Sequence, residues 1–287
     1  MHYSVMLRES LEYLAVKPEG TYLDATTGLG GHTKAIAERL TAGRVIASDR
    51  DEEALGVARE NTAAVADRIR FVRARFSELP LVLKKEGIGR VDGLLADLGL
   101  SMFQIRSGRG FSFSSRAPLG MKMGEGETDT PDAAELVNTL SEKELANLIY
   151  RLGEERRSRT IARAIVRARP VRDTLHLAGV IEAAVPRTGR LHPATLTFQA
   201  LRRAVNREPE ELDALLAALP DVVAAGGRVV VISFMSLEDR QVKEAFRELA
   251  RSGRARLLTK HVVTPGDEEM RANAASRSAK LRALEMS

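Results

Sequence analysis

The chain has 287 residues, which is enough for one large domain or two of ordinary size. Hydrophobic residues make up 44% of it, as in a globular protein with a substantial core. No apolar stretch approaches the roughly 20 residues that cross a bilayer, so we expect no membrane partner. Cysteine is absent, which excludes disulfides, thiolate metal sites and a cysteine nucleophile. We therefore expect a cytoplasmic protein.

The chain is basic, with 44 Lys and Arg residues against 39 Asp and Glu, a net charge of +5. Basic surfaces favour polyanions, because neutralised phosphates release their counterions. An Arg-rich composition unrelated to ligands would give the same charge, so charge alone does not decide between the two. Tryptophan is absent and aromatics make up 4%, which argues against a broad base-stacking platform.

Short apolar runs alternate with helical patterns over the first hundred residues, which is typical of a parallel α/β sheet. The sequence predicts four strands, at 21–24, 44–49, 69–73 and 91–97. It also predicts two helices between them, at 32–40 and 51–64. Asp51 is placed to cap the second helix. With right-handed crossovers these elements form a doubly wound sheet.

After residue 97 this alternation stops. Residues 98–130 are rich in Gly, Ser, Arg and Pro, and 131–206 are helical in pattern throughout. An apolar strand returns at 227–234 and is followed by a helix at 237–250. Two further strand-like pieces, 256–263 and 278–285, could pair at the end of the chain. We therefore expect a core domain made of 1–104 and 209–287, with an all-helical domain inserted at 105–208.

A glycine-rich segment joins the first strand to the first helix, and its glycines are Gly28, Gly30 and Gly31. Glycines let a backbone turn tightly and approach a ligand closely. A dinucleotide fingerprint fits poorly, because its third glycine would stand at Thr33. Asp24 would repel a diphosphate but could attract the ammonium or sulfonium group of S-adenosylmethionine. Three interpretations stay open here: a methyl-donor site, a dinucleotide site or a structural turn.

Other candidate ligand contacts follow the ends of the predicted strands. Asp49 ends the second strand, where a carboxylate can accept hydrogen bonds from both ribose hydroxyls. Phe76 follows the third strand and could lie against an adenine ring, although a single Phe at such a place often belongs to the core. Asp97 ends the fourth strand and faces the crevice where open α/β sheets bind ligands, with Gln104 just beyond it.

Several motifs occur in one order along the chain: DATTGLGGHT (24–33), DRD (49–51), DLG (97–99), RGFSF (109–113), GEER (153–156), HPAT (192–195), TFQALR (197–202), SLEDR (236–240) and RSAKLR (277–282). With these motifs the chain resembles the bacterial 16S ribosomal RNA methyltransferase H family, also called MraW. That family methylates N4 of a cytidine in the decoding region.

The resemblance implies a class I methyltransferase (Rossmann-like) core with an inserted helical substrate domain. It implies S-adenosylmethionine as the cofactor and 16S rRNA within the small ribosomal subunit as the partner. The donor contacts carried over by motif are Gly30, Gly31, His32, Asp49, Phe76, Asp97 and Gln104. No His, Asp or Glu residues have convincing metal-ligand spacing, so we expect no metal. The sequence does not indicate an oligomeric state.

The chain departs from the family pattern at several places: Ser4 for Pro, Met102 for Ser, Arg106 for an acidic residue, Met235 for His, and Ala274-Ala275 for Pro-Arg. None of these removes a donor contact. Met102 and Arg106 flank the expected reaction crevice, so they leave the recognition of cytidine open.

Cytosine N4 is a poor nucleophile, because its lone pair is delocalised into the ring. Oxygen acceptors aimed at its N–H groups would draw electron density to the nitrogen, while the enzyme aligns the donor and excludes water. Our hypothesis is that Asp97, or backbone carbonyls of residues 97–101, supplies these acceptors. The alternative is that Asp97 only holds the donor.

The inserted region is the expected RNA face. Arg156, Arg159 and Arg163 follow helical spacing and, with Arg167, could form one stripe. The alternative is a solvated face with Glu154 and Glu155 as intrahelical partners.

Upstream of that stripe, Arg109, Phe111 and Phe113 could clamp and stack an unpaired base. Alternatively, both Phe side chains seat this loop against the core. We expect His192 to cap or pack rather than to catalyse, and His176 to be a structural or surface residue.

Three rival functions remain at this stage. One is a methyltransferase of the same fold that acts on another RNA or on a protein. Another is a nicotinamide-dependent oxidoreductase, which Asp24 and the missing third glycine disfavour. The third is a non-catalytic ribosome assembly factor that retains the donor pocket.

Overall fold

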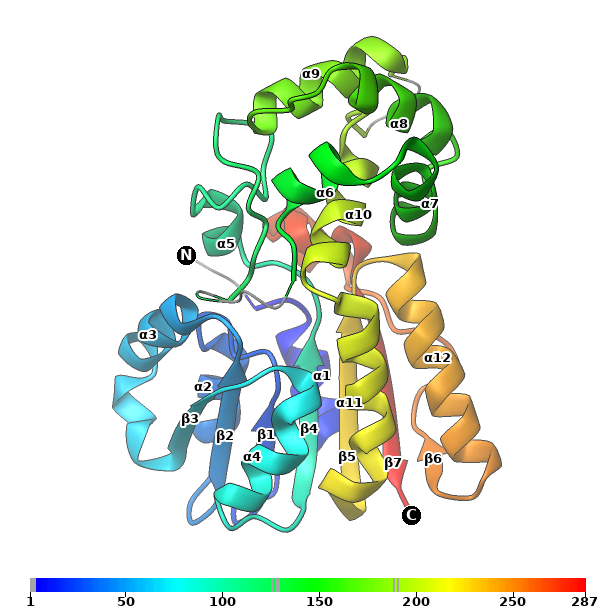
Figure 1. The fold of residues 1–287 in the computed structure, drawn as a ribbon. Helices are drawn as coiled ribbons and strands as arrows, with labels where there is room; N and C mark the ends of the chain where they lie inside the picture. Colours follow the sequence, from blue (N-terminus) through cyan, green and yellow to red (C-terminus); the bar gives the residue numbers. More distant parts are fainter. Residues whose placement is uncertain (1–3, 125, 127–129, 188, 190) are drawn as a thin grey trace. The chain divides into compact units, whose positions relative to one another are not determined.

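The computed structural model describes residues 4–124, 126, 130–187, 189 and 191–287. The chain divides into two compact units (Figure 1). One combines the residues up to Gly99 with Glu210–Ser287, and the other comprises Leu100–Pro209. None of the helices in the described ranges has both the length and the apolar character needed to cross a bilayer.

The first unit is built on a seven-stranded sheet of order β3-β2-β1-β4-β5-β7-β6. Its strands are β1 (Thr21–Asp24), β2 (Arg44–Asp49), β3 (Ile69–Arg73), β4 (Val91–Asp97), β5 (Val223–Ser233), β6 (Ala255–Leu257) and β7 (Lys280–Met286). β1 to β5 run parallel, whereas β7 is antiparallel to both of its neighbours. The first four strands have the predicted bounds, and the two terminal strands pair with each other as expected.

Helices cover both faces of this sheet, which confirms the doubly wound architecture. They are α1 (Leu7–Leu14), α2 (Gly31–Ala37), α3 (Glu52–Asn61), α4 (Leu79–Lys85), α11 (Glu208–Val222), α12 (Ser236–Arg251) and α13 (Asp267–Ala272), with the 3₁₀ turns η1 (Ala63–Arg68), η2 (Phe76–Glu78) and η3 (Ala274–Ser278). Successive strand residues point to opposite faces. Leu94 therefore packs with leucines of α4 and α11 in one core, and Leu95 packs with α1 and α2 in another.

Local sequence signals explain where the helices begin. Asp51 caps α3, as predicted, by accepting a hydrogen bond from the Ala54 N–H group. The helices α1, α4, α11 and α13 were not predicted. Pro220, a residue type that usually ends a helix, lies inside the last turn of α11.

The regular elements of the second unit are all helices among its described residues, and residues 107–124 between the first two helices form neither helix nor strand. Its helices are α5 (Met102–Arg106), α6 (Ala133–Thr139), α7 (Glu142–Gly153), α8 (Ser158–Arg167), α9 (Thr174–Ala184) and α10 (Thr195–Val205). Ser141 and Glu144 form a capping box that starts α7. Apolar residues of α6 to α10, among them Ile149, Ile165 and Phe198, form a core of this unit's own.

Candidate active site

The loop between β1 and α2 depends on two glycines. Gly28 and Gly30 have φ angles of +51° and +88°, a backbone region that favours glycine. A Cβ added to Gly30 would also lie only 2.9 Å from Cγ2 of Thr62. Gly31 opens α2 directly after this turn. The glycine pattern therefore sets the path of the backbone along the carboxyl ends of the strands.

Three carboxylates end three adjacent strands beside this loop. The register places Asp24 of β1 opposite Ala47 of β2 and Leu95 of β4, so the strand ends lie side by side. Asp49 ends β2 and Asp97 ends β4. The negative charge predicted for this edge of the sheet is therefore gathered at one place.

Asp24 is completely buried and holds the loop from within. Its Oδ2 accepts a hydrogen bond of 2.6 Å from the Thr33 hydroxyl, and its Oδ1 accepts one of 3.1 Å from the Thr26 N–H group. Burial raises the pKa of Asp24 to about 6, the hydrogen bonds oppose this shift, and the charge of Asp49 adds to it. Asp24 thus shapes the loop directly, and an effect of its charge on a ligand stays a prediction.

Asp49 connects the same loop to the end of β2. Its Oδ2 accepts from the Gly28 N–H group at 2.8 Å, and its Oδ1 accepts from the Asp51 N–H group at 3.0 Å. Burial raises the pKa of Asp49, against these two hydrogen bonds. A carboxylate oxygen has two lone pairs, so each oxygen of Asp49 can accept a further bond from a hydroxyl group.

Asp97 has an unmet acceptor. Its N–H group donates to the Thr26 hydroxyl at 2.6 Å, but its Oδ1 is buried without a hydrogen-bond partner among the residues that the structure describes. Its Oδ2 lies 3.8 Å from Nδ1 of His32. Burial raises the pKa of Asp97 well above its usual value, and the charges of Asp24 and Glu269 add to the shift. Since a buried unpaired oxygen is costly, a cation or an N–H donor would be stabilised here.

His32 joins this carboxylate to the start of the chain. The ring is nearly buried, and its Nε2 lies 3.1 Å from the Val5 carbonyl oxygen. A Cβ added to Gly31 would lie 1.9 Å from the Ser4 hydroxyl oxygen. Residues 4–6, called the N-terminal wall below, therefore lie directly against the glycine loop.

The remaining predicted donor contacts lie in different parts of the chain. Phe76 begins η2 at the end of β3 and is half-buried against the core. Gln104 belongs to the helical unit, where its side chain accepts from the Ser101 N–H group in the capping box of α5. Contact of either residue with a donor stays a prediction.

These residues fit a cationic nucleoside. The charge of Asp49 helps to raise the pKa of Asp24, and the charge of Asp24 helps to raise the pKa of Asp97. A positively charged ligand would relieve this repulsion between carboxylates. A diphosphate would add negative charge to the same place, which disfavours the dinucleotide interpretation. The fold and this site define a class I S-adenosylmethionine-dependent methyltransferase.

Comparison with known proteins identifies the family. The family model described as the MraW methylase family matches residues 1–287, and the chain belongs to this family. The "Ribosomal RNA small subunit methyltransferase H" of Solibacter usitatus is 59% identical over the whole of both chains. The protein of the same name from Koribacter versatilis is 49% identical over 98% of this chain and 93% of its own. Among solved structures, an rRNA methylase from Streptococcus thermophilus matches with a TM-score of 0.47 at 12% identity, over 100% of this chain and 99% of its own.

The arginine stripe predicted for the helical unit lies on α8 and just before it. Arg156, Arg159, Arg163 and Arg167 are all exposed. The Nε atom of Arg163 lies 3.3 Å from Oε1 of Glu142, an exposed pair that contributes little to stability. Glu155, considered above as a partner of the stripe, is buried and instead binds Arg157. The stripe therefore presents positive charge to solvent.

The RGFSF segment packs mainly against its own unit. The Phe113 ring stacks on His192 with centroids 4.7 Å apart and meets Phe198 edge-on at 5.0 Å. Arg109 lies over the Phe111 ring at 5.7 Å and donates to the Met123 carbonyl oxygen. This geometry favours the interpretation in which the Phe side chains seat the loop, since His192 already stacks on one face of Phe113.

His192 packs, which is one of the two structural roles expected for it: its ring stacks on Phe113, whereas α10 has no side-chain cap hydrogen bond. Its Nδ1 accepts a hydrogen bond from the Ala194 N–H group at 3.2 Å, next to the start of α10.

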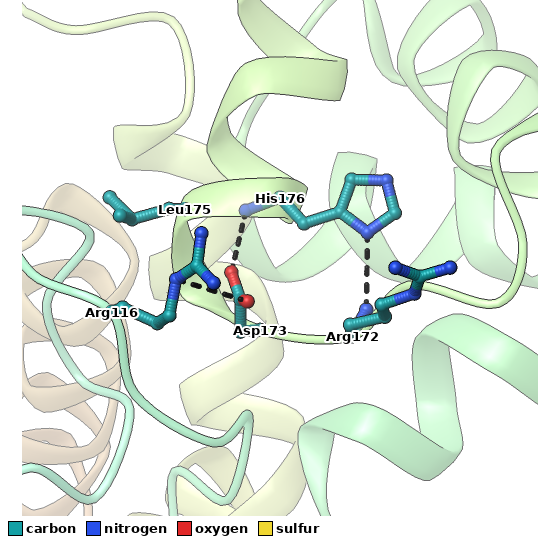
Figure 2. A pocket seen from close by; sticks show the side chains of 5 residues that line it. All are labelled: Arg116, Arg172, Asp173, Leu175 and His176. Carbon is teal, nitrogen blue, oxygen red and sulfur yellow. Dashed lines mark hydrogen bonds and ion pairs between the residues drawn. The ribbon is translucent and has the colours of Figure 1, made fainter.

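A pocket in the helical unit was not predicted. It has a volume of about 490 Å³ and is lined by Arg116, Arg172, Asp173, Leu175 and His176 (Figure 2). Nε of Arg116 lies 3.5 Å from Oδ2 of Asp173, and Nδ1 of His176 accepts from the Arg172 N–H group at 3.2 Å. Apart from the density of arginines, no sequence pattern indicates this pocket, because Arg116 is far along the chain from the other four residues.

Proposed function

We propose that this chain transfers the methyl group of S-adenosylmethionine to N4 of one cytidine in the decoding region of 16S rRNA. The observation that carries the proposal is the buried, unpartnered Oδ1 of Asp97 at the edge of the donor site. Family membership supports it, as do relatives named for methylation of the small-subunit ribosomal RNA. The cytoplasm, where ribosomal subunits are assembled, is the proposed place of action.

S-adenosylmethionine supplies an electrophilic methyl group on a sulfonium centre. Asp49 would hold the ribose hydroxyls, the backbone of Gly28–Gly31 would follow the amino-acid part of the donor, and Phe76 would lie against the adenine. The buried carboxylates of Asp24 and Asp97 favour a positive charge between them. These residues bind and align the donor, which is the larger part of catalysis in a displacement reaction.

Asp97 would also act on the acceptor. Its side chain is 22% exposed and would accept a hydrogen bond from the exocyclic amine, which draws electron density toward N4. The amine loses a proton on methylation, and a carboxylate with a raised pKa binds that proton more readily than an ordinary one does. Backbone carbonyls of residues 97–101 could supply a second acceptor.

The helical unit would hold the RNA. Its exposed arginine stripe and the two guanidinium groups of the pocket in Figure 2 suit phosphate contacts, which position a nucleic acid. Gln104, Arg109, Phe111 and Phe113 also belong to this unit. We assign to them the approach of the target base, with Phe113 supporting the loop rather than stacking.

Transfer of a labelled methyl group tests the proposal. Small subunits from cells that lack this protein would be incubated with the enzyme and methyl-labelled S-adenosylmethionine, and the rRNA digested to nucleosides. The expected product is N4-methylcytidine, at one position in 16S rRNA. Label in another nucleoside or in protein would assign a different acceptor, and binding without any transfer would indicate an assembly factor.

A further inference from the structure

Glu269 connects the last part of the chain to the first. It lies on α13, and its Oε1 accepts a hydrogen bond of 2.7 Å from the Met6 N–H group, 263 residues earlier. Met6 is fully buried and has a left-handed backbone with φ of 51°, immediately before α1. Glu269 therefore holds the backbone at the point where the N-terminal wall turns into a helix.

The N-terminal wall is fixed at its other end by the donor loop. Nε2 of His32 lies 3.1 Å from the Val5 carbonyl oxygen, and the Ser4 hydroxyl lies where a Cβ of Gly31 would stand. The wall is thus held between the glycine loop on one side and Glu269 on the other. A substitution at Glu269 that moved the Met6 backbone would therefore also move residues 4–6, which contact the donor loop.

Glu269 also acts through its charge. The titratable groups that face Asp97, among the described residues, come from three elements: Asp24 of β1, His32 of α2 and Glu269 of α13. The Met6 N–H group that Glu269 binds is neutral, so this hydrogen bond does not cancel the charge of the carboxylate. Asp24 and Glu269 therefore both add negative charge near Asp97, at a site whose proposed donor is a cation.

We propose that Glu269 is a positioning residue of the methyl-donor site, which holds the N-terminal wall against the glycine loop and favours the positively charged donor over its neutral-sulfur product. This inference rests on the proposed function, since it takes S-adenosylmethionine as the donor. The donor and its product S-adenosylhomocysteine differ by the methyl group and by one positive charge on sulfur. A fixed negative charge near the site attracts the positively charged sulfur of S-adenosylmethionine but not the neutral sulfur of S-adenosylhomocysteine.

Binding calorimetry with the full chain tests this at pH 8.5, where ionised carboxylates are favoured. Glu269→Gln keeps an oxygen for the Met6 N–H group but removes the charge. We expect the affinity for S-adenosylmethionine to fall about fivefold. The affinity for S-adenosylhomocysteine should fall less than twofold. Glu268→Gln is the matched control, because Glu268 is the exposed neighbour on the same helix, and it should leave both affinities unchanged.

Glu269→Ala removes the hydrogen bond as well, and both affinities should then fall. The thermal unfolding midpoint of each unliganded variant reports whether the fold is intact. Equal losses for the two ligands in Glu269→Gln would overturn the electrostatic role, and wild-type affinities in a folded Glu269→Ala would overturn the positioning role. If the wild-type chain bound neither ligand, the proposed function itself would be wrong.

Discussion

The Thr33 hydroxyl donates a hydrogen bond of 2.6 Å to Oδ2 of Asp24, at the position where a dinucleotide-binding loop would have its third glycine. One residue therefore accounts for two features of the loop. It replaces the glycine, and it provides the donor that allows a carboxylate to be completely buried at the end of β1.

Removing this hydroxyl should damage both the fold and the site. Thr33→Val keeps the shape but removes the hydroxyl group that donates to Oδ2 of Asp24. We expect a loss of about 1–3 kcal/mol in the free energy of unfolding, measured with urea, and weaker binding of S-adenosylhomocysteine. Thr41→Val is the control, because the Thr41 hydroxyl makes a long, exposed bond to the Pro18 carbonyl oxygen. Equal stability of the two variants would contradict the role of Thr33.

The buried Asp24 should make stability depend on pH. Its pKa is raised from 3.8 to about 6 in the folded chain, so the folded state binds a proton more tightly than the unfolded state does. This contribution is fully present below pH 3.8 and is lost as pH rises through 6, by roughly 3 kcal/mol in total.

Asp24→Asn removes that titration. The free energy of unfolding of the wild type, minus that of the variant, should therefore decrease between pH 4.5 and 7.5. Urea denaturation at several pH values measures this difference. A difference that stays constant or increases over this range would show that Asp24 is not buried as described.

The two kinds of glycine in the first unit should respond oppositely to alanine. Gly30→Ala puts a side chain into a left-handed backbone and within 2.9 Å of Thr62, so stability and affinity for the donor should both fall. Gly56 lies inside α3 with no atom near its potential Cβ, and Gly56→Ala should stabilise the chain by up to about 1 kcal/mol. Calorimetry and thermal unfolding measure both effects. A harmless Gly30→Ala would contradict the loop geometry.

The arginines of the helical unit should affect the RNA and not the donor. Two double variants test this: Arg156→Gln with Arg159→Gln, and Arg116→Gln with Arg172→Gln. Each should raise KM for small subunits. Each should also weaken the salt dependence of binding, by about one unit in the slope of log affinity against log salt per lost phosphate contact. The dissociation constant of S-adenosylhomocysteine should not change. Arg70→Gln is a control in the other unit, where Arg70 binds Glu86. An unchanged KM in either double variant would remove that group from the RNA face.

Sequence reasoning placed the strands well because the apolar runs and their ends are local signals. Asp24, Asp49 and Asp97 could be found from their positions at strand ends. The hydrogen-bond partners of Asp24 could not be predicted. Thr26 and Thr33 can donate to Asp24 only because the glycine turn folds both of them back toward it. Glu269 was missed because its contact with Met6 joins opposite ends of the chain. Similarly, the pocket around Arg116 exists only once α9 has packed.

The most direct test of the account is a single-turnover measurement with Asp97→Asn, using small subunits that lack the modification. The rate of methyl transfer should fall by at least about a hundredfold, as for loss of a group that acts on the reacting amine. The affinity for S-adenosylhomocysteine should stay within about threefold of the wild type, because that ligand lacks the sulfonium charge. A variant that binds this ligand normally and transfers the methyl group at the wild-type rate would contradict the role of Asp97.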